Sequence, residues 1–389
     1  MKGTTRTAVA MTVAVAIAVG SLALATPYWT AAALIARASG AGGWTGTLAR
    51  WNARPLTEHV EQMPVRSGVL RTRIFRPVGV SHRSALLVGG VHRDGIDEPR
   101  LVALARELAA TGVKTVTPEI DDLVHYRLTA RVTDAIEEAA TAIVESAEKG
   151  TGKVGLIGVS FSGGLSVVAA GRPGLRDRVA YVMSFGGHGN LPRVLRYLCT
   201  GIEPAVSGGA RGQSRPPHDY AVAVLLHQAA ELLVPDPQIA PLRQGIELFL
   251  EASALKRTSP TEAGRLFEAA RHAEEALPEP SLTLMKHVND RDVARLGARI
   301  APYLDRLSQD PSLSPDRAPP PSAPVYLLHG ADDNVIPAAE SALLSAHLRG
   351  HTRVRLLLSG YLTHADLADR PTPKDTWDMI AFWKGALSE

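Results

Sequence analysis

The chain has 389 residues, of which 45% are hydrophobic and 21% are charged, and its formal net charge is +3 at pH 7. This composition predicts a packed globular core and excludes wholesale disorder, and the scattered basic residues indicate an ordinary surface and not a nucleic-acid interface. The single cysteine, Cys199, excludes an internal disulfide and a thiolate metal cluster.

The N-terminal segment is typical of a targeting signal. Lys2 and Arg6 precede an uncharged run over residues 7–36, whose most apolar part is residues 8–25. A positive flank before an apolar stretch is the layout of a secretory signal. The run is longer than the usual ~7–15 residue core of such a signal, and ~17–25 residues can span a bilayer.

We therefore expect residues 1–36 to be an uncleaved signal anchor, in preference to a signal peptide cleaved after Ala25. Either form of export places the rest of the chain outside the cytoplasm, because the positive flank stays inside. The protein would be membrane-anchored if the segment is uncleaved and secreted if it is cleaved. A buried core helix is the third interpretation of this run.

Strand and helix patterns alternate over residues 58–185, after a connector over residues 37–57. Two alternating runs around Ser67-Gly68 predict a β-hairpin. Further strands are predicted at 84–88, 113–118, 153–159 and 178–185, and helices at 99–110, at 133–148 and from about 163. Strands that alternate with helices predict a doubly wound, mostly parallel α/β sheet.

The pattern changes over residues 186–322. Helices are predicted at 221–233, 241–254, 260–277 and 290–307, followed by a proline-rich linker from about 311. Strands return at 325–328 and 352–358, and a helix closes the chain at 374–387. We therefore expect residues 58–185 and residues 323–389 to form two pieces of one core, with a helical insertion between them.

The most informative segment is Lys153 to Gly164, where an apolar strand ends in Gly158-Val159-Ser160 and small residues follow. Such a strand-to-helix turn holds a serine hydroxyl above the edge of a parallel sheet. A serine nucleophile needs a histidine base, which a carboxylate orients. The strand at 325–328 runs into Asp333, and the strand at 352–358 runs into a loop that contains His364.

The order Ser160, Asp333, His364, with each residue just beyond a strand, resembles the α/β-hydrolase family over about residues 58–185 and 323–387. The family's Gly-x-Ser-x-Gly turn is matched by Gly158 and Ser160, and its His-Gly-x-x-Asp stretch by His329, Gly330 and Asp333. The resemblance implies that Ser160 is the nucleophile, Asp333 the acid and His364 the base. It also implies an oxyanion hole formed by the backbone amides of Val91 and Phe161.

The chain departs from the family pattern at two places. Ser162 stands where the second glycine of the turn is expected, and it is an alternative nucleophile to Ser160, although the strand ends in register for Ser160. The loop that would carry the oxyanion hole begins Gly89-Gly90-Val91, where a His-Gly pair is common in the family.

Several neighbouring residues have competing interpretations. Asp332 is an alternative acid and His351 an alternative base, whereas His329 is expected to be a structural hydrogen-bonding residue. Gly90, His92, His188 and Ser162 are candidates for lining the site.

The resemblance implies a serine hydrolase that cleaves a small-molecule carboxylic ester, or a related acyl bond, through an acyl-enzyme on Ser160, without metal or cofactor. A helical cap, formed by the insertion, would enclose the site. An acyltransferase or thioesterase with the same triad is the alternative function, and a non-catalytic binding protein of hydrolase-like fold is the second alternative.

Overall fold

The structure is a computed structural model that describes residues 25–146, 152–206, 212–360 and 372–389. Its centre is an eight-stranded sheet of order β1-β2-β4-β3-β5-β6-β7-β8. The first two strands form the expected hairpin, and β2 pairs antiparallel with β4, whereas all later pairs are parallel. The strands are β1 (Leu56–Val65), β2 (Gly68–Pro77), β3 (Arg83–Val88), β4 (Val113–Pro118), β5 (Val154–Val159), β6 (Val179–Phe185), β7 (Val325–Gly330) and β8 (Val354–Ser359).

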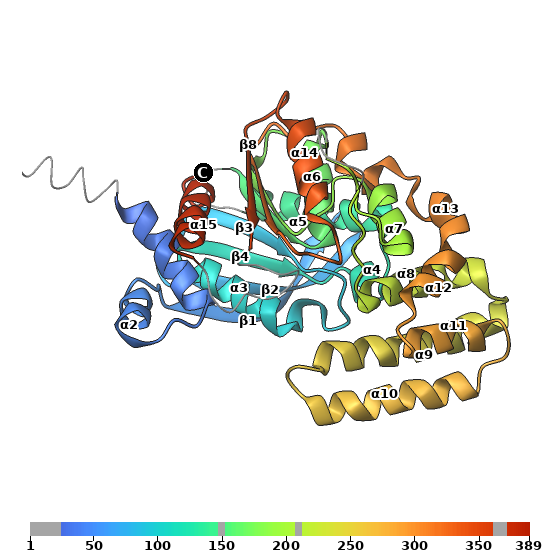
Figure 1. Cartoon of the computed structure of the whole chain (residues 1–389). Helices are drawn as coiled ribbons and strands as arrows, with labels where there is room; N and C mark the ends of the chain where they lie inside the picture. The colour runs from blue at the N-terminus through green and yellow to red at the C-terminus, as the bar shows by residue number, and fades with distance from the viewer. Residues whose placement is uncertain (1–24, 147–151, 207–211, 361–371) are drawn as a thin grey trace, which may run out of the picture.

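Helices cover both faces of the sheet (Figure 1). One face packs against α3 (Pro99–Ala110), α15 (Pro373–Ala386) and the helix at residues 25–38, and the other packs against α5 (Ala130–Glu145), α6 (Phe161–Gly171) and α14 (Ala338–Leu348). The central strands are therefore apolar on both sides: Leu86 of β3 faces one layer and Leu87 faces the other. This doubly wound arrangement was predicted from the alternation of strand and helix patterns.

A helical insertion over residues 186–322 separates β6 from β7 and extends away from one end of the sheet (Figure 1). Its helices are α7 (Leu191–Thr200), α8 (Asp219–Leu233), α9 (Asp236–Leu255), α10 (Pro260–Glu275), α11 (Ser281–Asn289), α12 (Val293–Ile300) and α13 (Leu304–Ser308). The sequence did not predict α7 and α11.

Proline explains two other differences in the insertion. The single helix predicted at 290–307 is wrong, because Pro302 lies in a 3-10 turn at Ala301–Tyr303 between α12 and α13. Conversely, Pro241 was taken as a helix start but lies inside α9, five residues after Asp236. Its missing N–H removes the one intrahelical bond that this residue would donate, and α9 continues past it.

The N-terminal region contains a second short helix where a connector was expected. Residues 25–38 are helical, and α2 (Gly43–Trp51) follows within the range predicted to be irregular. Only Gly46 and Ala49 of α2 are buried, so no large apolar residue marks a buried face in its sequence. Among the helices that the structure describes, none is long and apolar enough to cross a bilayer. The expected anchor lies mostly outside the described residues.

Candidate active site

The turn at Ser160 is the most constrained feature of the sheet edge. Ser160 follows β5 and has φ 58° and ψ −135°, a left-handed conformation that is rare for a residue with a side chain. Its N–H donates to the carbonyl of Phe185 at 2.7 Å, and its carbonyl accepts from the N–H of Gly163 at 2.8 Å. A Cβ at Gly158 would lie 2.2 Å from the carbonyl oxygen of Ser162, so this tight turn requires glycine there.

The loop after β3 passes directly beside this turn. A Cβ placed on Gly90 would lie 3.3 Å from the Cβ of Ser160, which shows how closely the loop backbone approaches the serine. Phe161 begins helix α6, so its amide belongs to the unpaired first turn of that helix. The two segments that were expected to carry the oxyanion hole, at Val91 and Phe161, therefore border Ser160.

Ser162 lies inside α6 and is completely buried. Its hydroxyl donates to the carbonyl of Gly89 at 2.6 Å. This bond ties the loop after β3 to the helix that follows Ser160, a role that glycine at this position does not supply. The geometry favours Ser160 over Ser162 as the residue at the apex of the turn.

Asp333 follows β7 at the same edge of the sheet, where the carboxyl ends of the parallel strands meet. It is 1% exposed, and its Oδ1 accepts from the amides of Val335 at 2.8 Å and Ile336 at 3.0 Å. These bonds fix the orientation of the carboxylate. The neighbouring Asp332 is instead exposed and pairs with Arg215 at 3.1 Å, so Asp333 is the one of the two aspartates whose carboxylate is buried and fixed.

The two histidines near the acid and the last strand differ in burial. His329 is fully buried: its Nδ1 lies 2.7 Å from the hydroxyl of Ser341, and its Nε2 lies 2.8 Å from the carbonyl of Ile336 and 3.3 Å from Oδ2 of Asp333. His351 is exposed and precedes β8, at the end of the sheet away from Ser160. His364, the expected base, lies outside the described residues.

His92 and His188 have different surroundings. His188 is 1% exposed, its Nε2 lies 2.7 Å from the carbonyl of Leu313, and its ring packs against Phe161. Burial lowers the pKa of His188, which favours the neutral form of the ring that packs against Phe161. His92 lies on the loop after β3, where its Nδ1 accepts from the amide of Asp94 at 3.2 Å, and burial lowers its pKa too.

The insertion contacts the loop after β3, beside Ser160, and the loop after β7 that carries Asp333, which the sequence did not reveal. Tyr220 of α8 donates its hydroxyl to the carbonyl of Val91 at 3.3 Å, and Arg93 pairs with Glu251 of α9. On the acid side, the carbonyl of Asn334 accepts from the His218 amide at 2.9 Å and from the Tyr197 hydroxyl at 3.2 Å.

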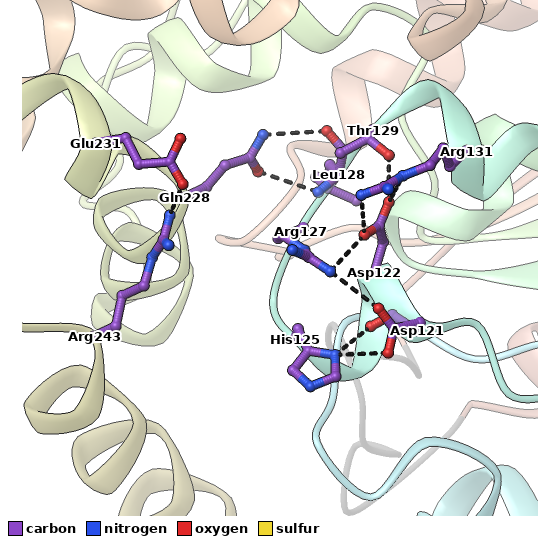
Figure 2. Close-up of polar contacts among 10 residues, drawn as sticks. All are labelled: Asp121, Asp122, His125, Arg127, Leu128, Thr129, Arg131, Gln228, Glu231 and Arg243. Carbon is purple, nitrogen blue, oxygen red and sulfur yellow. Dashed lines mark hydrogen bonds and ion pairs between the residues drawn. The ribbon is translucent and has the colours of Figure 1, made fainter. Parts of the chain in front are cut away.

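A third contact joins the insertion to the loop between α4 (Asp121–Val124) and α5 (Figure 2). The side chain of Gln228 on α8 donates to the carbonyl of Leu128 at 3.1 Å and accepts from its amide at 3.2 Å. Buried Asp122 stiffens this loop, because its carboxylate binds Arg127, Thr129 and Arg131.

A hollow of about 670 Å³ lies between α8 and α9, apart from Ser160, and is lined by Glu231, Asp236, Ile239, Ala240, Arg243, Gln244 and Glu247. Arg243 pairs with Glu231 at 2.8 Å across it. Its open, charged walls differ from the enclosed, mainly apolar sites that bind small molecules. Within the described ranges, no group of three or more His, Cys, Asp or Glu side chains is arranged to hold a metal ion.

The strand order, the antiparallel β2, the serine at the sharp turn after β5 and the buried aspartate after β7 together define an α/β-hydrolase fold. The chain therefore adopts the fold of the family that its sequence resembles.

Several hydrolases are among the solved structures whose chains follow a similar course. An esterase from Pyrobaculum calidifontis is 15% identical, with a TM-score of 0.46, and the match covers 94% of each chain. A dienelactone hydrolase from Anabaena variabilis is 16% identical, with a TM-score of 0.41, and the match covers 85% of this chain and 96% of that one.

The Pyrococcus horikoshii acylaminoacyl peptidase is 12% identical, with a TM-score of 0.42, and the match covers 89% of this chain but only 43% of the peptidase. No family model and no curated protein matches the sequence. Likeness at this distance transfers neither an activity nor a substrate to this chain.

Proposed function

We propose that the chain is a serine hydrolase that cleaves a small-molecule carboxylic ester, or a related acyl bond, through an acyl-enzyme on Ser160. His364 removes the proton of the Ser160 hydroxyl as its Oγ attacks the carbonyl carbon, and Asp333 orients the histidine. The amides of Val91 and Phe161 bind the oxyanion of the tetrahedral intermediate. The intermediate expels the alcohol, which takes the proton from His364, and water then hydrolyses the acyl-enzyme.

The backbone of Ser160 is the observation that carries this proposal. A non-glycine residue at φ 58° and ψ −135° costs about 1–3 kcal/mol, and such strain persists only where the surrounding structure enforces it. The strain holds the Ser160 side chain beside the loop at Gly90. An ordinary strand-to-helix connection has no need of such a conformation.

In this proposal the insertion serves as the cap of the site. Its helices bind the loop at Val91 through Tyr220 and the loop at Asn334 through Tyr197. Burial raises the pKa of the Tyr220 hydroxyl, which therefore stays a neutral hydrogen-bond donor to the loop. The apolar N-terminal run exports the protein and, when uncleaved, anchors it.

Covalent labelling of the full chain with a fluorophosphonate probe tests the proposal. We expect the parent and Ser162→Ala to be labelled and Ser160→Ala to remain unlabelled. Loss of labelling in Ser162→Ala alone would identify Ser162, and not Ser160, as the nucleophile. If the folded parent is not labelled, a non-catalytic role is favoured. If it is labelled, a screen of esters with different acyl lengths is the next step.

A further inference from the structure

Four of the five tryptophans of the chain are exposed. Trp29, Trp44, Trp51 and Trp377 have exposed fractions of 46%, 75%, 80% and 59%, whereas Trp383 is buried. Tyr28 is exposed beside them, and every other exposed large hydrophobic side chain in the described ranges is valine, isoleucine or leucine. Because tryptophan is usually buried, such a concentration indicates a surface that has a partner.

These five aromatic residues, called here the aromatic surface, come from three elements that are packed together. The rings of Tyr28 and Trp377 stack at 5.8 Å, which joins the helix at residues 25–38 to α15. Arg37 of that helix donates to the carbonyl of Ala49 in α2 at 2.9 Å. All three elements lie at the end of the molecule opposite α9, α10 and α11 (Figure 1).

Helix α2 displays its aromatic side chains and buries its small ones. Trp44 and Trp51 are seven residues apart and therefore lie on one face of the helix, whereas the buried residues are Gly46 and Ala49. Folding of this chain alone leaves both indole rings in water. Burial against a partner would recover roughly 25 cal/mol for each Å² of apolar area removed from water.

The residue type and the charge of this region fit a bilayer surface. Tryptophan and tyrosine are enriched at the level of lipid headgroups because their rings are apolar and carry one polar group. The first acidic residue of the chain is Glu58, whereas Arg50 and Arg54 lie in or just after α2. On α15, Lys374 and Lys384 balance the charges of Asp375 and Asp378, and the ammonium of Lys384 lies 5.3 Å from the ring centre of Tyr28. The positive charge of Arg50 and Arg54 therefore favours contact with anionic lipid.

The sequence before the aromatic surface favours the bilayer over a second copy of this chain. The apolar stretch over residues 8–25 ends only three residues before Tyr28. A symmetric contact between two copies would bring α2 of one protomer near α2 of the other, with Arg50 present and no carboxylate in either helix to pair with it.

We propose that the aromatic surface docks on the headgroup region of an anionic lipid bilayer, so that α2 lies on the membrane and the insertion helices lie at the far end of the molecule. This docking adds to any anchoring by residues 8–25. Trp44 and Trp51 are the decisive positions, because anchoring by that segment alone would bring only Tyr28 and Trp29 near the lipid.

Quenching of tryptophan fluorescence by brominated lipid tests this proposal on the full chain, in vesicles of phosphatidylcholine and phosphatidylglycerol. A variant with all four exposed tryptophans changed to Phe retains Trp383 and gives the baseline. Restoring either Trp44 or Trp51 in this variant adds one fluorescent reporter on α2. The control is the same variant with Ile202→Trp, which places the reporter at an exposed position of the insertion. We expect about twofold quenching of the Trp44 and Trp51 emission, since interfacial rings lie at headgroup level. No quenching is expected for Trp383 or Ile202→Trp.

Two results would overturn the proposal. Quenching of a restored Trp29 without quenching of Trp44 and Trp51 would show that residues 8–25 alone meet the bilayer. A blue shift of Trp44 and Trp51 that grows with protein density, without quenching by brominated lipid, would identify a second copy as the occupant. Neither readout depends on hydrolase activity, and fluorophosphonate labelling of the same variants reports the active site separately.

Discussion

At the scale of single residues, the candidate site combines one strained residue with one fixed carboxylate. Ser160 takes a left-handed backbone conformation, and the carboxylate of Asp333 accepts two amide hydrogen bonds in a buried setting. In the proposed mechanism, both features orient a reactive group before any substrate arrives. Such preorganisation is the main contribution that a protein makes to acyl transfer.

The two adjacent aspartates allow a matched test of the acid. We expect Asp333→Asn to lower kcat by about 10³–10⁴-fold, because an amide holds the histidine in the wrong tautomer. The control, Asp332→Asn, removes only an exposed pair with Arg215 and should leave kcat unchanged. Steady-state kinetics on an ester that the parent hydrolyses provides the measurement. Equal losses in the two variants would contradict the assignment of Asp333.

The strain at Ser160 is measurable as stability. Ser160→Gly removes the Cβ that disfavours φ 58°, whereas Ser160→Ala keeps it and also lacks the hydroxyl. We expect the glycine variant to have a free energy of unfolding about 1–3 kcal/mol higher than that of the alanine variant, measured by urea denaturation. Equal stabilities would show that the backbone is relaxed at this turn.

At the scale of elements, the insertion is tied to the core by side-chain ion pairs, such as that of Arg93 with Glu251, and by polar contacts to backbone atoms. Tyr220 binds the carbonyl of Val91, and Gln228 binds both backbone groups of Leu128 (Figure 2). A hydrogen bond to the backbone depends little on the side chain of the partner. The sequence therefore contains no complementary pair of residues from which these contacts could be inferred.

Gln228→Ala should loosen the insertion without unfolding the core. Loss of its two bonds leaves the amide and carbonyl of Leu128 without these partners, which costs about 1–3 kcal/mol. We expect faster hydrogen exchange in α8 and unchanged exchange in β5. Glu231→Ala is the matched control on the same helix, since its carboxylate pairs only with Arg243 of the insertion among the contacts drawn in Figure 2. Unchanged exchange in α8 of Gln228→Ala would show that other contacts hold the insertion.

At the scale of the whole molecule, the chain has two ends of different character. The insertion helices lie at one end and the helices that carry the exposed aromatic residues lie at the other, with the sheet between them (Figure 1). The helix at residues 25–38 is fixed to the sheet layer by Ala31 and Leu34 and by Arg37, which pairs with Glu107 of α3 at 2.6 Å. This ion pair and these apolar contacts together hold the helix that carries Tyr28 and Trp29 against the core.

Glu107→Gln should release the N-terminal helices from the core. The Arg37 side chain is 6% exposed, so loss of its charged partner costs about 1.5–3 kcal/mol. We expect increased hydrogen exchange in α2 and residues 25–38, while fluorophosphonate labelling is unchanged. Glu145→Gln breaks a solvated pair with Arg178 and should cost less than 1 kcal/mol. If fluorophosphonate labelling decreases together with the hydrogen-exchange protection of the N-terminal helices, these helices also support the site.

The sequence by itself determined the order of the eight strands along the chain, the turn at Ser160 and the place of Asp333 just beyond a strand, because hydrophobic period, turn residues and strand ends are local properties of the chain. It also indicated that His329 is structural. Only the tertiary structure decided that Ser162 binds Gly89, that His188 is buried beneath Phe161 and that α2 presents Trp44 and Trp51 to solvent. Those features depend on contacts between segments far apart in the chain, and packing decides such contacts where the local pattern leaves several choices open.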